Sequence, residues 1–481
     1  MTAPPLDDAT AAREAVAARR IERWGTAGLT VAAAAALAAT FRLAALAPSA
    51  VLAVPGVVVA AVCLVVILRS PLASVGTAIL LSLALAGIAD DYPAGKVLFG
   101  GYVVLYIALW YGRAWASGQR IIRSGADAGM ALLLVLGVIG GTALGVLFQN
   151  PAESMAGNIQ ALLPLFLYFP VKEVCVRERL GLHVVAGCVL ALGVAAAAQN
   201  AFNTSRALSS ATEIWQIVDV RVAYGEMALT ASMILSVALL FAHRGSWLGR
   251  ASLVGLFGIL TAGMILTKSR GFWVAVLLGL GVFAIILQDR DRRRMLTMAA
   301  TGGMAFIGLA LLVAGQYAVL IATGIAKRFL TISTAGSADP SLINRFTESA
   351  AAWARIKESP ILGHGWGVEY SYYSIIAEGT MRWAYVHNGY LGIWLKIGLW
   401  GLGLVLWVWV GAISAGARAA RDQRQPALAR GLGGAAAATL VAFLLVANTS
   451  PPLENADQVM VLLVVWALAQ GVAQRAFVQR A

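Results

Sequence analysis

The chain has 481 residues, of which 60% are hydrophobic and only 12% are charged, and its mean hydropathy is +0.80. These values exclude a soluble globular domain and are typical of a polytopic membrane protein. The formal net charge of +13 does not indicate a nucleic-acid partner, because basic loops at a membrane surface and attraction to anionic lipid account for it.

The amino-terminal segment, residues 1–26, is polar and charged and contains no apolar stretch, so we expect it to be cytoplasmic and not a cleaved signal peptide. The three cysteines show neither the spacing of a metal site nor that of a disulfide framework. Beyond this segment we expect three further parts, namely a transmembrane bundle of about eleven spans over 27–322, a periplasmic loop domain over 323–386, and C-terminal transmembrane helices with a short cytoplasmic tail over 387–481.

Apolar stretches of roughly 20 residues, long enough for a membrane helix, recur along the chain. They predict an all-α polytopic membrane protein with 12–14 transmembrane helices. The first and fourth are the weakest, because Arg42 and Lys96 interrupt them. The predicted spans begin near Ala27, Ala50, Pro71, Ala94, Ala128, Met155, Gly181, Val222, Leu248, Gly271, Thr297, Gly389, Gly431 and Ala456.

Basic residues predict the orientation of these spans, because cytoplasmic loops carry an excess of Lys and Arg. If the amino terminus is cytoplasmic, each inside segment is basic, the cluster DRDRRR at 289–294 is the densest, and both termini lie inside. The same assignment counts Lys172 among the inside residues. A minority of basic residues then lies outside, where the rule disfavours them, including Arg221, Lys268, Arg270, Arg345, Arg355, Lys357 and Arg382.

The long outer segment, residues 323–386, is expected to contain a helix, a glycine-rich turn and a run of aromatic residues. LINRFTESAAAWARIKES has helical periodicity, with Asn344 as a candidate cap and Pro360 as the residue that ends the helix. ILGHGWG follows as the turn. The aromatic residues suit stacking on sugar rings, although an interfacial aromatic belt explains them equally well; they are Trp366, Tyr370, Tyr372, Tyr373 and Trp383.

Three residues suited to chemistry on a charged substrate fall at the same outer surface. Arg221 begins one span, Arg270 stands in TKSRGFW beside Lys268, and His387 opens the span that follows the outer segment. Two guanidinium groups can grip a diphosphate bidentately, and a neutral histidine can accept a proton from a hydroxyl. The simpler alternative is that the arginines snorkel to lipid headgroups and that the histidine is a satisfied interface residue.

Other polar residues could support such a site. Glu226, one turn inside its span, could orient Arg221 or His387, although a structural ion pair is an equally good interpretation. The external His364, in GHGWG, is a reserve candidate for contacts with an acceptor. The carboxylates are scattered rather than clustered, so we expect neither a metal nor another cofactor. The remaining supporting candidates are Tyr224, Arg345, Arg382 and Asn388.

The pattern H-N-x9-G-x-x-G, from His387 to Gly401, resembles the motif of bacterial O-antigen ligases. TKSRG, and NRFTESAAAWARIKESPILGHGWG ahead of the histidine, look like the region that these ligases share with Wzy-type polymerases. The resemblance covers roughly residues 200–410. The ligase motif often has Thr after its last glycine, where this chain has Leu402.

The resemblance implies a GT-C-like, all-helical membrane glycosyltransferase with two helices in its periplasmic loop. It implies transfer of a glycan from undecaprenyl diphosphate to a sugar hydroxyl, on lipid A-core for a ligase or on another lipid-linked repeat for a polymerase. His387 matches the catalytic histidine, Arg221 and Arg270 match the essential periplasmic arginines, and Arg345 matches a recurrent loop arginine. The implied location is the bacterial inner membrane, with the site facing the periplasm and with membrane lipid and glycan as partners. A transporter of lipid-linked sugars is the rival of another class, but the chain shows neither paired repeats nor polar residues near the bilayer midplane.

Overall fold

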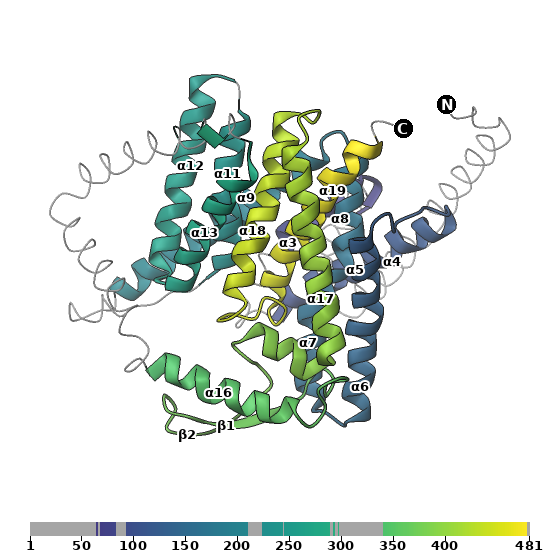
Figure 1. Cartoon of the computed structure of the whole chain (residues 1–481), viewed down its shortest axis with the longest axis vertical. Coiled ribbons are helices and arrows are strands. Elements are labelled where there is room, and N and C mark those ends of the chain that lie inside the picture. Colours follow the sequence, from purple (N-terminus) through teal and green to yellow (C-terminus); the bar gives the residue numbers. More distant parts are fainter. Residues whose placement is uncertain are drawn as a thin grey trace, which may run out of the picture.

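The computed structural model describes residues 64–65, 68–82, 93–209, 224–243, 245–288, 292–293, 297 and 340–478. In these residues the chain is mostly helical and has little sheet, which confirms the all-α polytopic membrane fold. Its elements, coloured along the chain in Figure 1, are α3 (Pro71–Leu81), α4 (Pro93–Ala116), α5 (Gly125–Leu132), the π-helical η3 (Leu133–Gly140), α6 (Gly141–Leu147), α7 (Ala152–Leu162), the 3-10 helix η4 (Leu163–Leu167), α8 (Tyr168–Arg177), α9 (Gly181–Ser209), α11 (Glu226–Ala242), α12 (Trp247–Leu266), α13 (Arg270–Ile286), α16 (Pro340–Ile356), β1 (Tyr370–Ser374), β2 (Gly379–Trp383), α17 (Gly389–Arg421), α18 (Ala427–Val446) and α19 (Ala456–Val478).

The helices coincide with the predicted spans wherever the two can be compared. Within the described part of the chain, 7 helical stretches are long and apolar enough to cross a membrane, while α3, α11 and α13 are shorter apolar helices. The predicted spans near Ala27, Ala50 and Thr297 lie mostly outside the described residues, so the total of 12–14 stays a prediction. The seven stretches are Gly125–Leu147, Ala152–Arg177, Gly181–Arg206, Trp247–Leu266, Gly389–Arg421, Ala427–Val446 and Ala456–Arg475.

Helices α18 and α19 form the centre of the bundle, and α8, α9, α11, α13 and α17 pack around them (Figure 1). The small residues of α18 allow close packing: a Cβ added at Gly416 of α17 would lie 2.5 Å from the carbonyl oxygen of Gly433. Close backbone approach through small residues is the usual basis of helix association in a membrane. On α19, the indole of Trp466 is fully buried and packs edge-on against Trp409 of α17.

A buried ion pair joins α5 and α8 inside the bundle. The Lys172 ammonium lies 2.9 Å from Asp127 Oδ2, and both side chains are fully buried. Tyr168 and Gln474 donate further hydrogen bonds to the same carboxylate, at 3.0 and 2.9 Å. Lys172, which the sequence places among the inside basic residues, therefore lies in helix α8 and neutralises a buried acid rather than facing solvent, and its side of the membrane stays a prediction.

A thin layer formed by α16 and a β-hairpin lies across one end of the bundle (Figure 1). Strands β1 and β2 pair antiparallel, with Tyr370 opposite Trp383 and Ser374 opposite Gly379. The aromatic sequence YSYYS of β1 favours a strand. Of the two loop helices that the resemblance implies, α16 is present, and residues 323–339 of the loop lie outside the described residues, so the second helix stays a prediction. Helix α16 begins at Pro340, so Asn344 is not its cap but lies inside it.

Candidate functional site

His387 stands immediately before α17, and the following residues fix the start of that helix. The Asn388 side chain accepts hydrogen bonds from the backbone N–H groups of Tyr390 and Leu391, at 3.1 and 3.2 Å, which is an N-cap. A Cβ added at Gly389 would lie 3.0 Å from the Cα of Pro451, so a small residue is needed there. Asn388 therefore supports the site by holding the residue before it at the helix entrance.

The closest partner of His387 is the carboxylate of Glu348, on α16. Glu348 Oε2 lies 2.6 Å from His387 Nδ1, and Oε1 accepts the backbone N–H of His387, also at 2.6 Å. The Glu348 side chain is only 2% exposed, whereas that of His387 is 37% exposed. A buried acid thus binds both the main chain and the ring of a histidine that stays open to solvent.

Glu348 was not predicted from the sequence, although a signal for it exists. The buried residues of α16 follow each other at intervals of four, which places them on one helix face. Ala352 and Ile356 are the apolar members of this face, so a glutamate in phase with them is directed into the interior. The full face is Asn344, Glu348, Ala352 and Ile356.

Two tyrosines complete the surroundings of His387. The Tyr370 hydroxyl lies 3.1 Å from Glu348 Oε1 and 2.8 Å from the Tyr385 carbonyl oxygen, so its one proton has two acceptors. Burial, and after it the charge of Glu348, raises the pKa of Tyr370, which therefore remains a donor. The ring of Tyr385 packs edge-on against the imidazole at 5.0 Å. Burial, followed by the charge of Glu454, also raises the pKa of Tyr385.

The two glycines that end the sequence motif lie at a kink in α17. Gly398 has φ +69° and ψ −178°, and a Cβ there would lie 1.9 Å from the carbonyl oxygen of Ile361. A Cβ at Gly401 would lie 2.4 Å from the Ile397 side chain. Both glycines are therefore required by close approach, and Gly398 also by a backbone conformation that essentially only glycine adopts.

The glycine-rich turn after α16 satisfies the backbone groups that the kink leaves unpaired. His364 N–H donates to the Leu395 carbonyl at 2.9 Å, and Gly365 N–H donates to the Lys396 carbonyl at 2.8 Å. In return, Leu399 N–H donates to the Pro360 carbonyl at 3.0 Å. Main-chain hydrogen bonds thus join the turn after α16 to α17, starting eight residues after His387. Through this turn the layer of α16 and the β-hairpin is attached to the kink.

Trp366 of this turn is buried in the bundle rather than exposed to a sugar. It is 3% exposed, and its indole N–H donates to the Gly137 carbonyl of η3 at 2.8 Å. The same carbonyl accepts the backbone N–H of Gly141 at the end of η3, so the indole adds a second donor there. Of the predicted stacking residues, Tyr370 is also buried, whereas Tyr373 and Trp383 are exposed.

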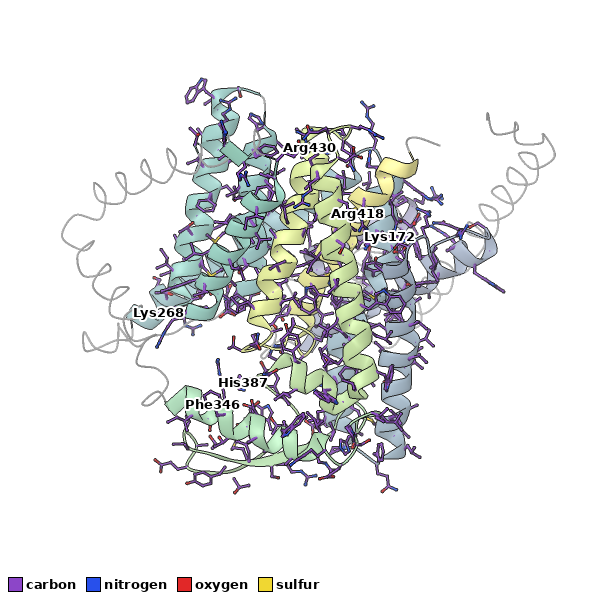
Figure 2. All side chains as sticks on the ribbon, viewed as in Figure 1. Lys172, Lys268, Phe346, His387, Arg418 and Arg430 are labelled. Atoms are coloured by element: carbon purple, nitrogen blue, oxygen red, sulfur yellow. The ribbon has the colours of Figure 1, made fainter. Side chains whose placement is uncertain are left out.

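Lys268 and Arg270 flank a turn between α12 and α13 at the same end of the molecule as His387. Figure 2 shows Lys268 and His387 at this end and Arg418 and Arg430 at the opposite one. Between the two basic residues, Ser269 donates a 2.5 Å hydrogen bond from its hydroxyl to Glu226 Oε1. Glu226 therefore fixes the turn that carries Lys268 and Arg270, while the acid bound to His387 is Glu348.

The other predicted residues divide into those near the site and those with structural partners. Arg221 lies outside the described residues. Arg345 is close enough to Tyr385 for its charge to lower that hydroxyl's pKa, though less than burial raises it. Tyr224 lines a small pocket with Asp457, and its carbonyl accepts the Asn200 amide at 3.0 Å.

Arg382 and His364 have partners of their own. Arg382 Nε lies 2.6 Å from Glu369 Oε2, in an exposed ion pair on the hairpin. His364 is 6% exposed and its Nε2 lies 2.9 Å from the Arg355 carbonyl oxygen. The prediction that His364 offers an external contact to an acceptor is wrong, because burial gives it a role in holding the turn.

Comparison with known proteins identifies one family model that matches part of the chain. The model of the family described as O-antigen ligase matches residues 255–408. That range includes Lys268, Arg270, Glu348, His387 and both glycines of the kink. No curated protein matches the chain. Over residues 255–408, this multi-pass membrane protein therefore matches the O-antigen ligase family model, and the match supports a relationship to the O-antigen ligase and Wzy-type superfamily.

Proposed function

We propose that the protein is a metal-independent, inverting glycosyltransferase that moves a glycan from undecaprenyl diphosphate to a sugar hydroxyl, with lipid A-core as the acceptor. The observation that carries this proposal is the half-exposed imidazole of His387, bound to a buried acid within the matching domain. The reaction would take place at the periplasmic face of the bacterial inner membrane, with both termini in the cytoplasm.

The chemistry assigned to His387 is general base catalysis. The imidazole takes the proton of the acceptor hydroxyl while the hydroxyl oxygen forms a bond to the anomeric carbon. The bond from that carbon to the diphosphate oxygen breaks on the opposite face, so the configuration inverts and the electron pair leaves with undecaprenyl diphosphate. General base catalysis contributes about 10²–10⁴-fold to such a step.

The basic residues of the α12–α13 turn are assigned to the leaving diphosphate. Arg270 and Lys268 would stabilise the negative charge that develops on it, together with Arg221. Positioned donors of this kind each supply a few kcal/mol of transition-state stabilisation. Because a diphosphate is already a good leaving group, no metal ion is required by this mechanism.

A Wzy-type polymerase is the second candidate, because the matching domain is common to both activities and the two differ in the acceptor. In that case the attacking hydroxyl belongs to another lipid-linked repeat. A transporter of lipid-linked sugars remains the third candidate. A transporter would need no proton acceptor at the membrane surface, so the placement of His387 argues against this candidate.

The test is transfer by the purified protein with undecaprenyl diphosphate-linked glycan as donor, in EDTA, with lipid A-core supplied or omitted. We expect a single-step product that requires lipid A-core and disappears in His387→Ala while donor binding persists. A ladder of lengthened lipid-linked glycan without lipid A-core would establish the polymerase instead. Transfer by His387→Ala at the wild-type rate would remove the proposed base, and a requirement for added metal would remove metal independence.

A further inference from the structure

We infer that Glu348 is a positioning residue that fixes the tautomer of His387. In that tautomer Nε2 is the atom that takes the proton from the hydroxyl of the sugar acceptor. This inference rests on the proposed function for its chemical meaning. The tautomer itself is a property of the resting protein and can be measured without substrate.

The distances define which nitrogen carries the proton. A carboxylate oxygen 2.6 Å from Nδ1 requires a hydrogen between the two atoms. Glu348 accepts the backbone N–H of His387 through its other oxygen, so its carboxylate is already held as an acceptor. The ring proton therefore belongs to Nδ1, and the lone pair belongs to Nε2.

The pair is built into the fold rather than formed by two mobile side chains. Glu348 is buried on the face of α16 that also holds Ala352 and Ile356, so the helix sets its position. Tyr370, from β1, offers its hydroxyl to the same carboxylate. Asn388 and Gly389 fix the main chain of His387 at the start of α17. A histidine with its main chain and one ring nitrogen both bound presents the other nitrogen in one orientation.

The carboxylate also matters after proton transfer. When Nε2 takes the acceptor's proton, the ring becomes an imidazolium with N–H groups on both nitrogens. Its Nδ1–H then remains paired with the buried, negatively charged Glu348, where a low dielectric strengthens the attraction. The proton stays on Nε2 until the ring releases it to solvent, and Glu348 is not itself protonated in the step.

A purely structural role is the competing explanation, because Glu348 also ties α16 to the residue before α17. The two explanations differ in what an amide would do. In Glu348→Gln the side-chain oxygen or the NH2 group can face Nδ1. The NH2 group donates a hydrogen bond to Nδ1, which favours the tautomer with hydrogen on Nε2. Such a ring is in place but cannot act as a base through Nε2.

The first measurement is ¹⁵N NMR of the full chain in detergent with only histidine labelled. The chain has 4 histidines, so His387 is assigned by the signal that His387→Ala removes. At a pH where the His387 ring is neutral, we expect the wild-type protein to carry the ring hydrogen on Nδ1. We expect Glu348→Gln to shift the ring toward the form with hydrogen on Nε2. A wild-type Nε2–H tautomer would overturn the inference, whatever the enzyme does.

The second measurement is single-turnover transfer with saturating donor. We expect Glu348→Gln to lower the rate about 10²–10⁴-fold, the range of general base catalysis, while the donor Kd changes less than about threefold. Glu348→Asp restores a carboxylate and should be at least about tenfold faster than Glu348→Gln. An unchanged rate in Glu348→Gln would contradict the inference.

Asn344→Ala is the matched structural control. Asn344 lies one turn away on the same face of α16, and its side chain accepts the Ile375 N–H at 3.1 Å. We expect this variant to lower the melting temperature and leave the tautomer unchanged. If it slows transfer as much as Glu348→Gln does, loosening of α16 explains both variants and the tautomer does not. If wild type transfers nothing, the proposed function fails while the NMR result still decides the tautomer.

Discussion

Ser269 stands between two cationic side chains, and the backbone around it is unusually constrained. Lys268 has φ +52°, a left-handed conformation that costs a non-glycine residue free energy. The Ser269 N–H is held by the Thr267 hydroxyl at 3.2 Å, and the Ser269 hydroxyl is held by Glu226. A turn fixed on both sides and flanked by cations is suited to bind an anion rather than only to anchor a helix in lipid.

Replacement of Arg270 tests this turn. We expect Arg270→Ala to weaken donor binding by about 10–100-fold, because a charge-assisted hydrogen bond contributes about 1.5–3 kcal/mol. Arg270→Lys should recover only part of the loss, since lysine lacks the bidentate fork. Isothermal titration with undecaprenyl diphosphate measures both, and Arg250→Ala, on α12 at the opposite end, is the control that should bind normally. If Arg270→Ala binds undecaprenyl diphosphate with wild-type affinity, the assignment of this turn to the diphosphate is wrong.

At the scale of single residues, the sequence identified candidate site residues better than it identified their hydrogen-bond partners. Figure 2 shows His387 and Lys268 at one end of the molecule, and Arg270 follows Lys268 two residues later at the start of α13. Glu226 was expected to orient Arg221 or His387. It binds Ser269, Glu348 binds the histidine instead, and a contact with Arg221 stays a prediction because that residue lies outside the described part of the chain. The contact between Glu348 and His387 joins residues far apart in the chain, so no local pattern could identify the pair.

Helix α17 carries the features that were hardest to anticipate among the elements. Its kink removes helical hydrogen bonds near Gly398, and the turn after α16 replaces them. Lys396, just before the kink, is fully buried and pairs with Glu454 at 2.5 Å. The kink is thus stabilised by hydrogen bonds and an ion pair that come from other elements, and it is not a flexible joint.

Gly398→Ala should destabilise the protein strongly. The φ of +69° alone costs a residue with a Cβ about 1–3 kcal/mol, and the clash with the Ile361 carbonyl adds to it. Gly403 is the matched control on the same helix, because a Cβ there meets nothing within 4 Å. Thermal unfolding in detergent should show a lower melting temperature for Gly398→Ala and little change for Gly403→Ala. Equal melting temperatures would mean that the helix can straighten without cost.

Hydropathy predicted the helices well because the membrane imposes their length and composition. All predicted spans that fall in the described residues correspond to helices. The kink in α17, the π-helical η3 and the β-hairpin were not predicted. The kink and η3 depend on contacts between elements distant in the chain, as with Trp366 on η3, so their cause is absent from the local sequence. The hairpin pairs two neighbouring strands, and the aromatic run of β1 is a local signal for it that the hydropathy pattern does not use.

The whole molecule is polarised, with the outer layer at one end and the basic connections at the other. Arg418 and Arg430 mark the end opposite His387 (Figure 2). The connection between α17 and α18, which follows Arg421 and contains Arg424, lies at that same end (Figure 1). By the positive-inside rule this end would face the cytoplasm and the layer of α16 and the hairpin would face the periplasm.

Cysteine labelling measures this orientation directly. In a background with the native cysteines replaced by serine, we expect Ala377→Cys, at the exposed hairpin tip, to react with a membrane-impermeant maleimide in intact spheroplasts. Gln423→Cys, in the exposed connection after α17, should react only after the membrane is permeabilised. The reverse labelling pattern would show the opposite orientation in the membrane, with His387 on the cytoplasmic side.

The hydrogen bonds between the glycine-rich turn and the kink of α17 have an evolutionary consequence. GHGWG and H-N-x9-G-x-x-G read as separate motifs, but Gly398 approaches Ile361 while His364 and Gly365 bind the carbonyls that its conformation exposes. A substitution in one motif therefore changes what the other can tolerate. Relatives that replace the glycine at the kink should also differ in the length or composition of the turn, so the two motifs should be inherited and lost together.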